Sequence, residues 1–157
     1  MAGYTGDEIF QIAMEMEETG EVFYEAMAAA GGSEAVANLC RRLAGQEREH
    51  YRTFEKMRAA LVTRPPDRPL TWEEMEFDQA LINDRVVPNP AEALRIASTG
   101  NLTETLDLAI RLERDSVTFY SEMLPFVAGD DAEAVGRIIK EEQRHVEELL
   151  IARRNLN

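Results

Sequence analysis

The chain has 157 residues, of which 45% are hydrophobic, and this is enough for one domain with a continuous core. Its 17 basic and 30 acidic residues give a formal net charge of −13, so we expect no nucleic-acid partner and no association with anionic membranes. The single cysteine, Cys40, excludes an internal disulfide and any site built from several cysteines. No apolar run approaches the roughly 20 residues of a membrane helix, and the acidic start of the chain is unlike a targeting peptide. We therefore expect a cytoplasmic protein.

The first half of the chain predicts two helices. The first lies between a capping box at residues 5–8 and the glycine pair at residues 31–32. The second lies between Ser33, as its capping residue, and the proline pair at residues 65–66. In each helix, mostly apolar residues recur at alternating spacings of three and four positions, which is typical of the inner face of a helical bundle. These inner faces carry Phe10, Ala13, Glu17, Gly20, Tyr24 and Met27, and then Leu39, Leu43, Glu47, His50, Phe54, Met57 and Leu61.

A long connection, from about residue 63 to residue 101, leads to the second half of the chain. We expect it to carry short helices, one starting near residue 71 and one from Pro90 to about Gly100, because long connections without structure are uncommon in compact domains. Two more helices follow, separated by a turn at residues 125–131. Their inner faces carry Leu102, Leu106, Ala109, Glu113, Ser116, Tyr120 and Met123, and then Val135, Ile138, Glu142, His145, Leu149 and Ala152.

The second half of the chain repeats the first with a displacement of 95 or 96 residues. The inner-face pattern between Ala13 and Tyr24 recurs between Ala109 and Tyr120, and both halves contain the motif Glu-x-x-His. The sequence therefore predicts a single all-α domain over residues 1–157. We expect a four-helix bundle made of two pseudo-symmetric helical hairpins, joined by a long crossover with short helices.

Each of the four inner faces, which should be apolar, carries a glutamate at its centre, and these glutamates are Glu17, Glu47, Glu113 and Glu142. Burial of a carboxylate without a partner costs several kcal/mol, and no Lys or Arg occupies an inner face to offset it. A pair of metal ions would offset the charge of all four carboxylates directly.

Both histidines of the chain support the same interpretation. His50 and His145 each lie three residues after an inner-face glutamate, so each motif turns a carboxylate and an imidazole to one side of its helix. Two such motifs, with one glutamate from each of the other two helices, form the ligand set of di-iron carboxylate bundles. Carboxylate and imidazole ligands together suit iron or manganese, and zinc also fits this set.

These motifs resemble the ferritin-like superfamily, most closely rubrerythrin-type di-iron domains, and the ligand pattern is also similar to that of bacterioferritin. The resemblance covers all four predicted helices and implies two iron ions per chain. It also implies a role for each of the six residues. Glu17 and Glu113 would be terminal ligands, Glu47 and Glu142 would bridge the two irons, and His50 and His145 would each bind one iron.

The chain departs from the rubrerythrin pattern in two respects. Rubrerythrins usually carry a further glutamate one turn after the ligand of the third helix, and this chain has Ser116 there. That difference weakens the case for the redox-linked carboxylate shift and for the peroxide reductase activity of the family. The chain also lacks the four cysteines of a rubredoxin module, so we expect electrons to come from a separate electron-donor protein.

Two tyrosines are candidates for a supporting role. Tyr24 and Tyr120 lie seven residues after Glu17 and Glu113. Tyrosines there can hydrogen-bond a ligand carboxylate or supply electrons to the metals, and the alternative is that they pack in the core with a satisfied hydroxyl.

Four further residues are candidates for the surroundings of the metals. Gly20 and Ser116 are small and each lies three residues after a predicted terminal ligand, so they either leave a pocket for the oxidant or allow close helix packing. Gln46 and Glu141 precede the predicted bridging glutamates, and they either accept a hydrogen bond from a histidine Nδ1–H on a neighbouring helix or are solvated.

The function that these expectations favour is that of an oxidoreductase, in which a carboxylate-bridged di-iron centre reacts with hydrogen peroxide or dioxygen as a peroxidase or ferroxidase. The alternatives are an iron-binding or iron-storage protein, a di-iron hydroxylase of organic substrates, and a metal-free interaction protein. The acidic composition argues against the hydroxylase, which would need an apolar channel or a membrane-facing helix. We expect a homodimer or a larger homo-oligomer.

Overall fold

A computed structural model describes residues 6–63 and 90–156 of the chain. Within these ranges the regular structure is helical, and no strand occurs. The helices are α1 (Gly6–Ala30), α2 (Glu34–Thr63), α4 (Pro90–Ala97), α5 (Leu102–Met123) and α6 (Gly129–Arg154), with a 3-10 turn at Leu124–Phe126.

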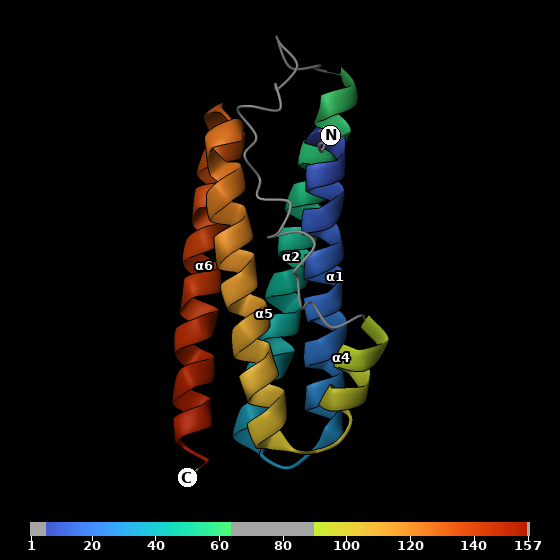
Figure 1. The fold of residues 1–157 in the computed structure, drawn as a ribbon, viewed down its shortest axis with the longest axis vertical. Coiled ribbons are helices and arrows are strands. Elements are labelled where there is room, and N and C mark those ends of the chain that lie inside the picture. The colour runs from blue at the N-terminus through green and yellow to red at the C-terminus, as the bar shows by residue number, and fades with distance from the viewer. Residues whose placement is uncertain (1–5, 64–89, 157) are drawn as a thin grey trace, which may run out of the picture.

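The four long helices lie side by side as two hairpins, α1 with α2 and α5 with α6 (Figure 1). Because α1 also contacts α5 and α2 contacts α6, the order around the bundle is α1, α2, α6, α5. The helix α2 ends at the upper end of the bundle in this view, whereas α5 begins at the lower end. This is the connectivity of a bundle with one long crossover, as the sequence predicts. The short helix α4 packs against α1.

Most predicted helix ends are confirmed. Gly31 and Gly32 end the first helix with φ of 81° and 101°, a backbone conformation that favours glycine. The hydroxyl of Ser33 accepts a hydrogen bond from Val36 N at 3.3 Å. The side chain of Asn101 caps α5 by accepting from Glu104 N. Three predicted features lie outside the described residues, namely Thr5 of the first capping box, the proline pair at 65–66 and the capping-box candidate at 71–74.

One predicted boundary is wrong. Gly129, Asp130 and Asp131 were expected in the turn before the last helix, but they form the first turn of α6. Acidic side chains there interact favourably with the positive end of the helix dipole. The 3-10 turn, which contains Pro125, makes the connection instead.

The core consists of two apolar clusters with a polar layer between them. One cluster includes Phe23, Leu43, Leu106 and Leu149, and the other includes Phe10, Phe54, Phe119 and Val135. Along each long helix the predicted metal ligands lie between the residues of the first cluster and those of the second. None of the described helices is long and apolar enough to cross a membrane.

Candidate metal centre

The structure brings the six predicted metal ligands together in the polar layer. Each long helix contributes one glutamate, and the two histidines come from α2 and α6. All six side chains are buried, with at most 4% of any residue exposed: Glu17, Glu47, His50, Glu113, Glu142 and His145.

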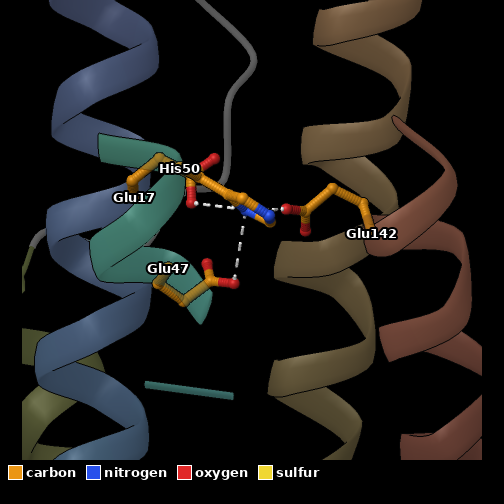
Figure 2. Close-up of side chains that lie close together, drawn as sticks. All are labelled: Glu17, Glu47, His50 and Glu142. Atoms are coloured by element: carbon orange, nitrogen blue, oxygen red, sulfur yellow. Dashed lines mark ion pairs between the residues drawn. The ribbon is translucent and has the colours of Figure 1, made fainter. Parts of the chain in front are cut away.

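The six residues form two overlapping groups, and in each group potential ligand atoms lie within 4.8 Å of one another. Glu47 and Glu142 belong to both groups. The first group is completed by Glu17 and His50, as Figure 2 shows, and the second by Glu113 and His145. Two ions held in this way would share the two common carboxylates.

The histidines direct Nδ1 at the carboxylates. His50 Nδ1 lies 2.7 Å from Glu142 Oε1 and 3.4 Å from Glu17 Oε2 (Figure 2). His145 Nδ1 lies 3.4 Å from Glu47 Oε1 and 3.5 Å from Glu142 Oε2. The two imidazole rings stack at a centroid distance of 5.9 Å with 20° between their planes. Each half of the bundle therefore presents one imidazole Nδ1 atom to the carboxylates at the centre.

Both tyrosines donate a hydrogen bond to a carboxylate of the cluster. The Tyr24 hydroxyl donates to Glu113, and the Tyr120 hydroxyl donates to Glu17. Each bond therefore joins α1 to α5. Along one helix, a tyrosine that lies seven residues after a glutamate is about 10 Å from it, which is too far for a hydrogen bond. Each tyrosine hydroxyl therefore reaches the glutamate of the opposite hairpin.

The outer nitrogens of the histidines contact the two residues that precede the shared glutamates. His50 Nε2 lies 2.6 Å from Glu141 Oε2, and His145 Nε2 lies 3.2 Å from Gln46 Oε1. The predicted partners are therefore present, but the predicted nitrogen is wrong. Nδ1 is the nitrogen nearer the backbone and faces the centre, which leaves Nε2 to face α2 or α6 of the other hairpin.

Seven buried atoms of the cluster form no hydrogen bond, although both histidine Nδ1 atoms lie within ion-pair distance of carboxylate oxygens. The seven are Glu17 Oε2, Glu47 Oε1, His50 Nδ1, Glu113 Oε2, both Glu142 carboxylate oxygens and His145 Nδ1. Buried polar atoms in folded proteins are nearly always paired, because an unpaired one costs about 1–3 kcal/mol. These seven atoms belong to the side chains of the two overlapping groups. Oxygen and imidazole nitrogen are suitable donors for a divalent transition-metal ion, so the cluster fits a metal pair.

Without metal, the cluster retains protons. Burial and the neighbouring carboxylates Glu113 and Glu17 raise the pKa of Glu142 to about 8, and similar causes hold the pKa of Glu47 well above its usual range. Burial alone would lower the pKa of both histidines, but nearby carboxylates outweigh it and raise the pKa of His50 to about 11 and of His145 to about 9. Metal binding must therefore displace protons.

Glu113 and the tyrosines behave differently. Burial favours the neutral form of Glu113, but the neighbouring Glu142 and His145 side chains and the hydrogen bond from Tyr24 outweigh it and lower its pKa. Burial and adjacent carboxylates raise the pKa of Tyr24 and Tyr120 well above the usual value, so both hydroxyls remain donors at neutral pH.

A cavity of about 20 Å³ lies beside the cluster between α1 and α5, and it could hold about one water-sized molecule. Gly20 and Ser116 line it, as the pocket interpretation predicts, together with Glu47 and Glu113. A Cβ at residue 20 would lie 2.5 Å from Glu47 Oε2, so glycine leaves room for that carboxylate. Thr19 also lines the cavity, and it was not among the predicted site residues because its only sequence signal is its place beside Gly20.

A four-helix bundle with two overlapping carboxylate and histidine groups at its centre defines a ferritin-like diiron-carboxylate fold. The chain belongs to the Rubrerythrin family, whose family model matches residues 8–152. It is similar to a crystal structure from Thermotoga maritima that is described as a ferritin-like diiron-carboxylate protein. The TM-score is 0.79 and the identity is 29%, with 100% of this chain and 99% of that chain covered. No curated protein matches the chain at a significant level.

The pKa shifts predict that the metal-free protein loses stability as the pH rises from about 4.5 to about 11. For each histidine, the folded state binds more protons than the unfolded chain at every pH between the ordinary pKa of 6.5 and the raised pKa. For Glu142 the same is true between pH 4.5 and about pH 8. The free energy of unfolding must then fall with pH. Thermal melts in the presence of a chelator measure this, and a constant or rising Tm would contradict the assignment of protons. Metal affinity should rise over the same interval, because the ligands bind metal when deprotonated.

Proposed function

We propose that the chain is an oxidoreductase that holds two iron ions and reacts with hydrogen peroxide or dioxygen. The observation that supports this most directly is the pair of overlapping ligand groups that share Glu47 and Glu142. In this proposal those two residues would be shared by both irons, and the remaining members of each group would hold one iron apiece. The remaining members are Glu17 with His50, and Glu113 with His145.

A bound iron pair would supply two electrons, which is enough to cleave the O–O bond of hydrogen peroxide or to reduce dioxygen to hydrogen peroxide with two protons. Reduction of hydrogen peroxide to two water molecules takes two electrons and two protons. Because the chain has one cysteine and hence no rubredoxin-type site of its own, we propose that a separate electron-donor protein returns these electrons.

The protein's own residues supply geometry and a restricted environment. The tyrosine bonds from Tyr24 and Tyr120 hold the carboxylates of Glu113 and Glu17 in place, which limits their rotation. The apolar clusters above and below the polar layer exclude bulk water. The cavity lined by Gly20 is the place where a small oxidant can approach, since it lies beside both a shared and a terminal carboxylate.

The first prediction from this proposal concerns metal content. The iron-loaded protein should contain two metal ions per chain, and binding should raise its Tm because metal stabilises only the folded state. Glu17→Gln should abolish most of this rise, since an amide is a poor metal ligand but can still accept the Tyr120 hydrogen bond. Calorimetry and metal analysis measure both effects.

The matched control is Glu18→Gln, which removes an acid from the adjacent, exposed position. It should keep both metals and change the free energy of unfolding by no more than about 0.5 kcal/mol. The ligand assignment fails if the two variants have the same metal content and the same metal-dependent Tm.

The second prediction concerns turnover. Anaerobically reduced, iron-loaded protein should be reoxidised by peroxide or dioxygen faster than free ferrous ion under the same conditions, as stopped-flow absorbance can measure. A clear preference for peroxide would support a peroxidase. Faster reaction with dioxygen, with iron accumulating beyond two ions per chain, would favour iron storage. Slow reaction with both oxidants would contradict an oxidoreductase.

The third prediction concerns the glycine of the cavity. Gly20→Ala should weaken metal binding or slow reoxidation, because its methyl group would force the Glu47 carboxylate to move. Gly136→Ala is the matched control, since a Cβ there meets nothing within 4 Å. The control should leave the metal site unchanged and raise stability by about 0.5–1 kcal/mol, the usual gain for alanine within a helix. Equal metal affinity and reoxidation rate in both variants would show that residue 20 does not shape the site.

A further inference from the structure

The two halves of the metal centre use the same residue types for their equivalent side-chain contacts, except at one position. The tyrosine bonds of Tyr24 and Tyr120 are reciprocal, and each group has one terminal glutamate and one histidine. The exception is the partner of the outer histidine nitrogen, which is the carboxylate of Glu141 in one half and the amide of Gln46 in the other. These two residues occupy equivalent positions of the internal repeat, directly before the shared glutamates.

The two contacts also differ in length. His50 Nε2 lies 2.6 Å from Glu141 Oε2, whereas His145 Nε2 lies 3.2 Å from Gln46 Oε1. A hydrogen bond to a carboxylate is shorter and about twice as strong as a bond between neutral groups. Each contact crosses between α2 and α6, so each partner is fixed by the opposite hairpin and not by the histidine's own helix.

The outer partner of a histidine affects metal binding because it changes the basicity of the imidazole ring. When Nδ1 binds a metal as a neutral imidazole, the ring proton is on Nε2 and is donated to the outer partner. A carboxylate acceptor makes the imidazole a more basic and hence stronger ligand than an amide acceptor does. Loss of such outer partners commonly changes metal affinity by about 10- to 100-fold.

We propose that the two metal positions are inequivalent, and that the position at His50 binds a divalent ion more tightly, and fills first, than the position at His145. This inference rests on the metal pair of the proposed function. It assigns Glu141 as the residue that sets the order of loading by positioning and polarising His50. A chain loaded with one equivalent of metal would then carry it mainly at one defined position.

The presence of only two histidines in the chain allows a direct test. Imidazole nitrogens of the ¹⁵N-histidine-labelled, metal-free protein are followed by NMR while Zn²⁺, a diamagnetic probe, is added. At one equivalent the signals of His50 should have shifted and those of His145 should be largely unchanged. At two equivalents both sets should have shifted.

The decisive variant exchanges the two outer partners. Gln46→Glu combined with Glu141→Gln keeps the net charge and the composition of the chain, and it should reverse the order so that His145 shifts first. Glu141→Gln alone gives both histidines an amide partner, so the two sets of signals should shift in parallel. Glu147→Gln removes one exposed acid from the same helix and should keep the native order.

The outcomes separate the two levels of the argument. Parallel shifts of both histidines in the native protein, or an unchanged order after the exchange, would overturn the inference while leaving the metal pair intact. If Zn²⁺ shifts neither histidine, the metal assignment itself is wrong. Should the exchange variant fail to fold, as judged by circular dichroism, the comparison of Glu141→Gln with the native protein still decides the question.

Discussion

The burial of four carboxylates in one layer of the core is the constraint on which the rest of this structure depends. Like charges at this depth cannot all remain ionised without cations or protons nearby, because both desolvation and mutual repulsion oppose it. In the metal-free state the raised pKa values of Glu47, Glu142 and the two histidines supply protons. The same protons occupy the atoms that a metal would bind, so the folded apoprotein is already organised for exchange of protons against metal.

The polar layer also links the two hairpins. Apolar contacts build each end of the bundle, but the tyrosine bonds join α1 to α5 and the outer histidine contacts join α2 to α6. All four contacts cross from one hairpin to the other at the level of the metal ligands. A substitution in this layer therefore affects both the centre and the registry of the two halves.

Much of the fold and of the ligand cluster could be predicted from the sequence, because helical periodicity fixes which residues share a face. A glutamate in the middle of an apolar face, and a histidine three residues later, can point only inward if that face is buried. The internal repeat then indicates which residues of the two hairpins occupy equivalent positions. The geometry that depends on how helices meet could not be predicted in this way. Interhelical distances determine that the tyrosines reach the opposite hairpin and that the histidine Nε2 atoms face outward. Turn conformation determines that α6 begins at Gly129.

The placement of the polar layer between two apolar clusters determines from which directions the centre can be reached. Along the bundle axis, a cluster of buried apolar side chains lies on each side of the polar layer. Laterally, the cavity lined by Gly20 lies between α1 and α5, and the partly exposed carboxylate of Glu141 lies on the α2 and α6 side. These two pairs of helices are on opposite flanks of the bundle. Within the described residues, the cavity and the carboxylate that contacts His50 therefore lie on different sides of the buried glutamates and histidines.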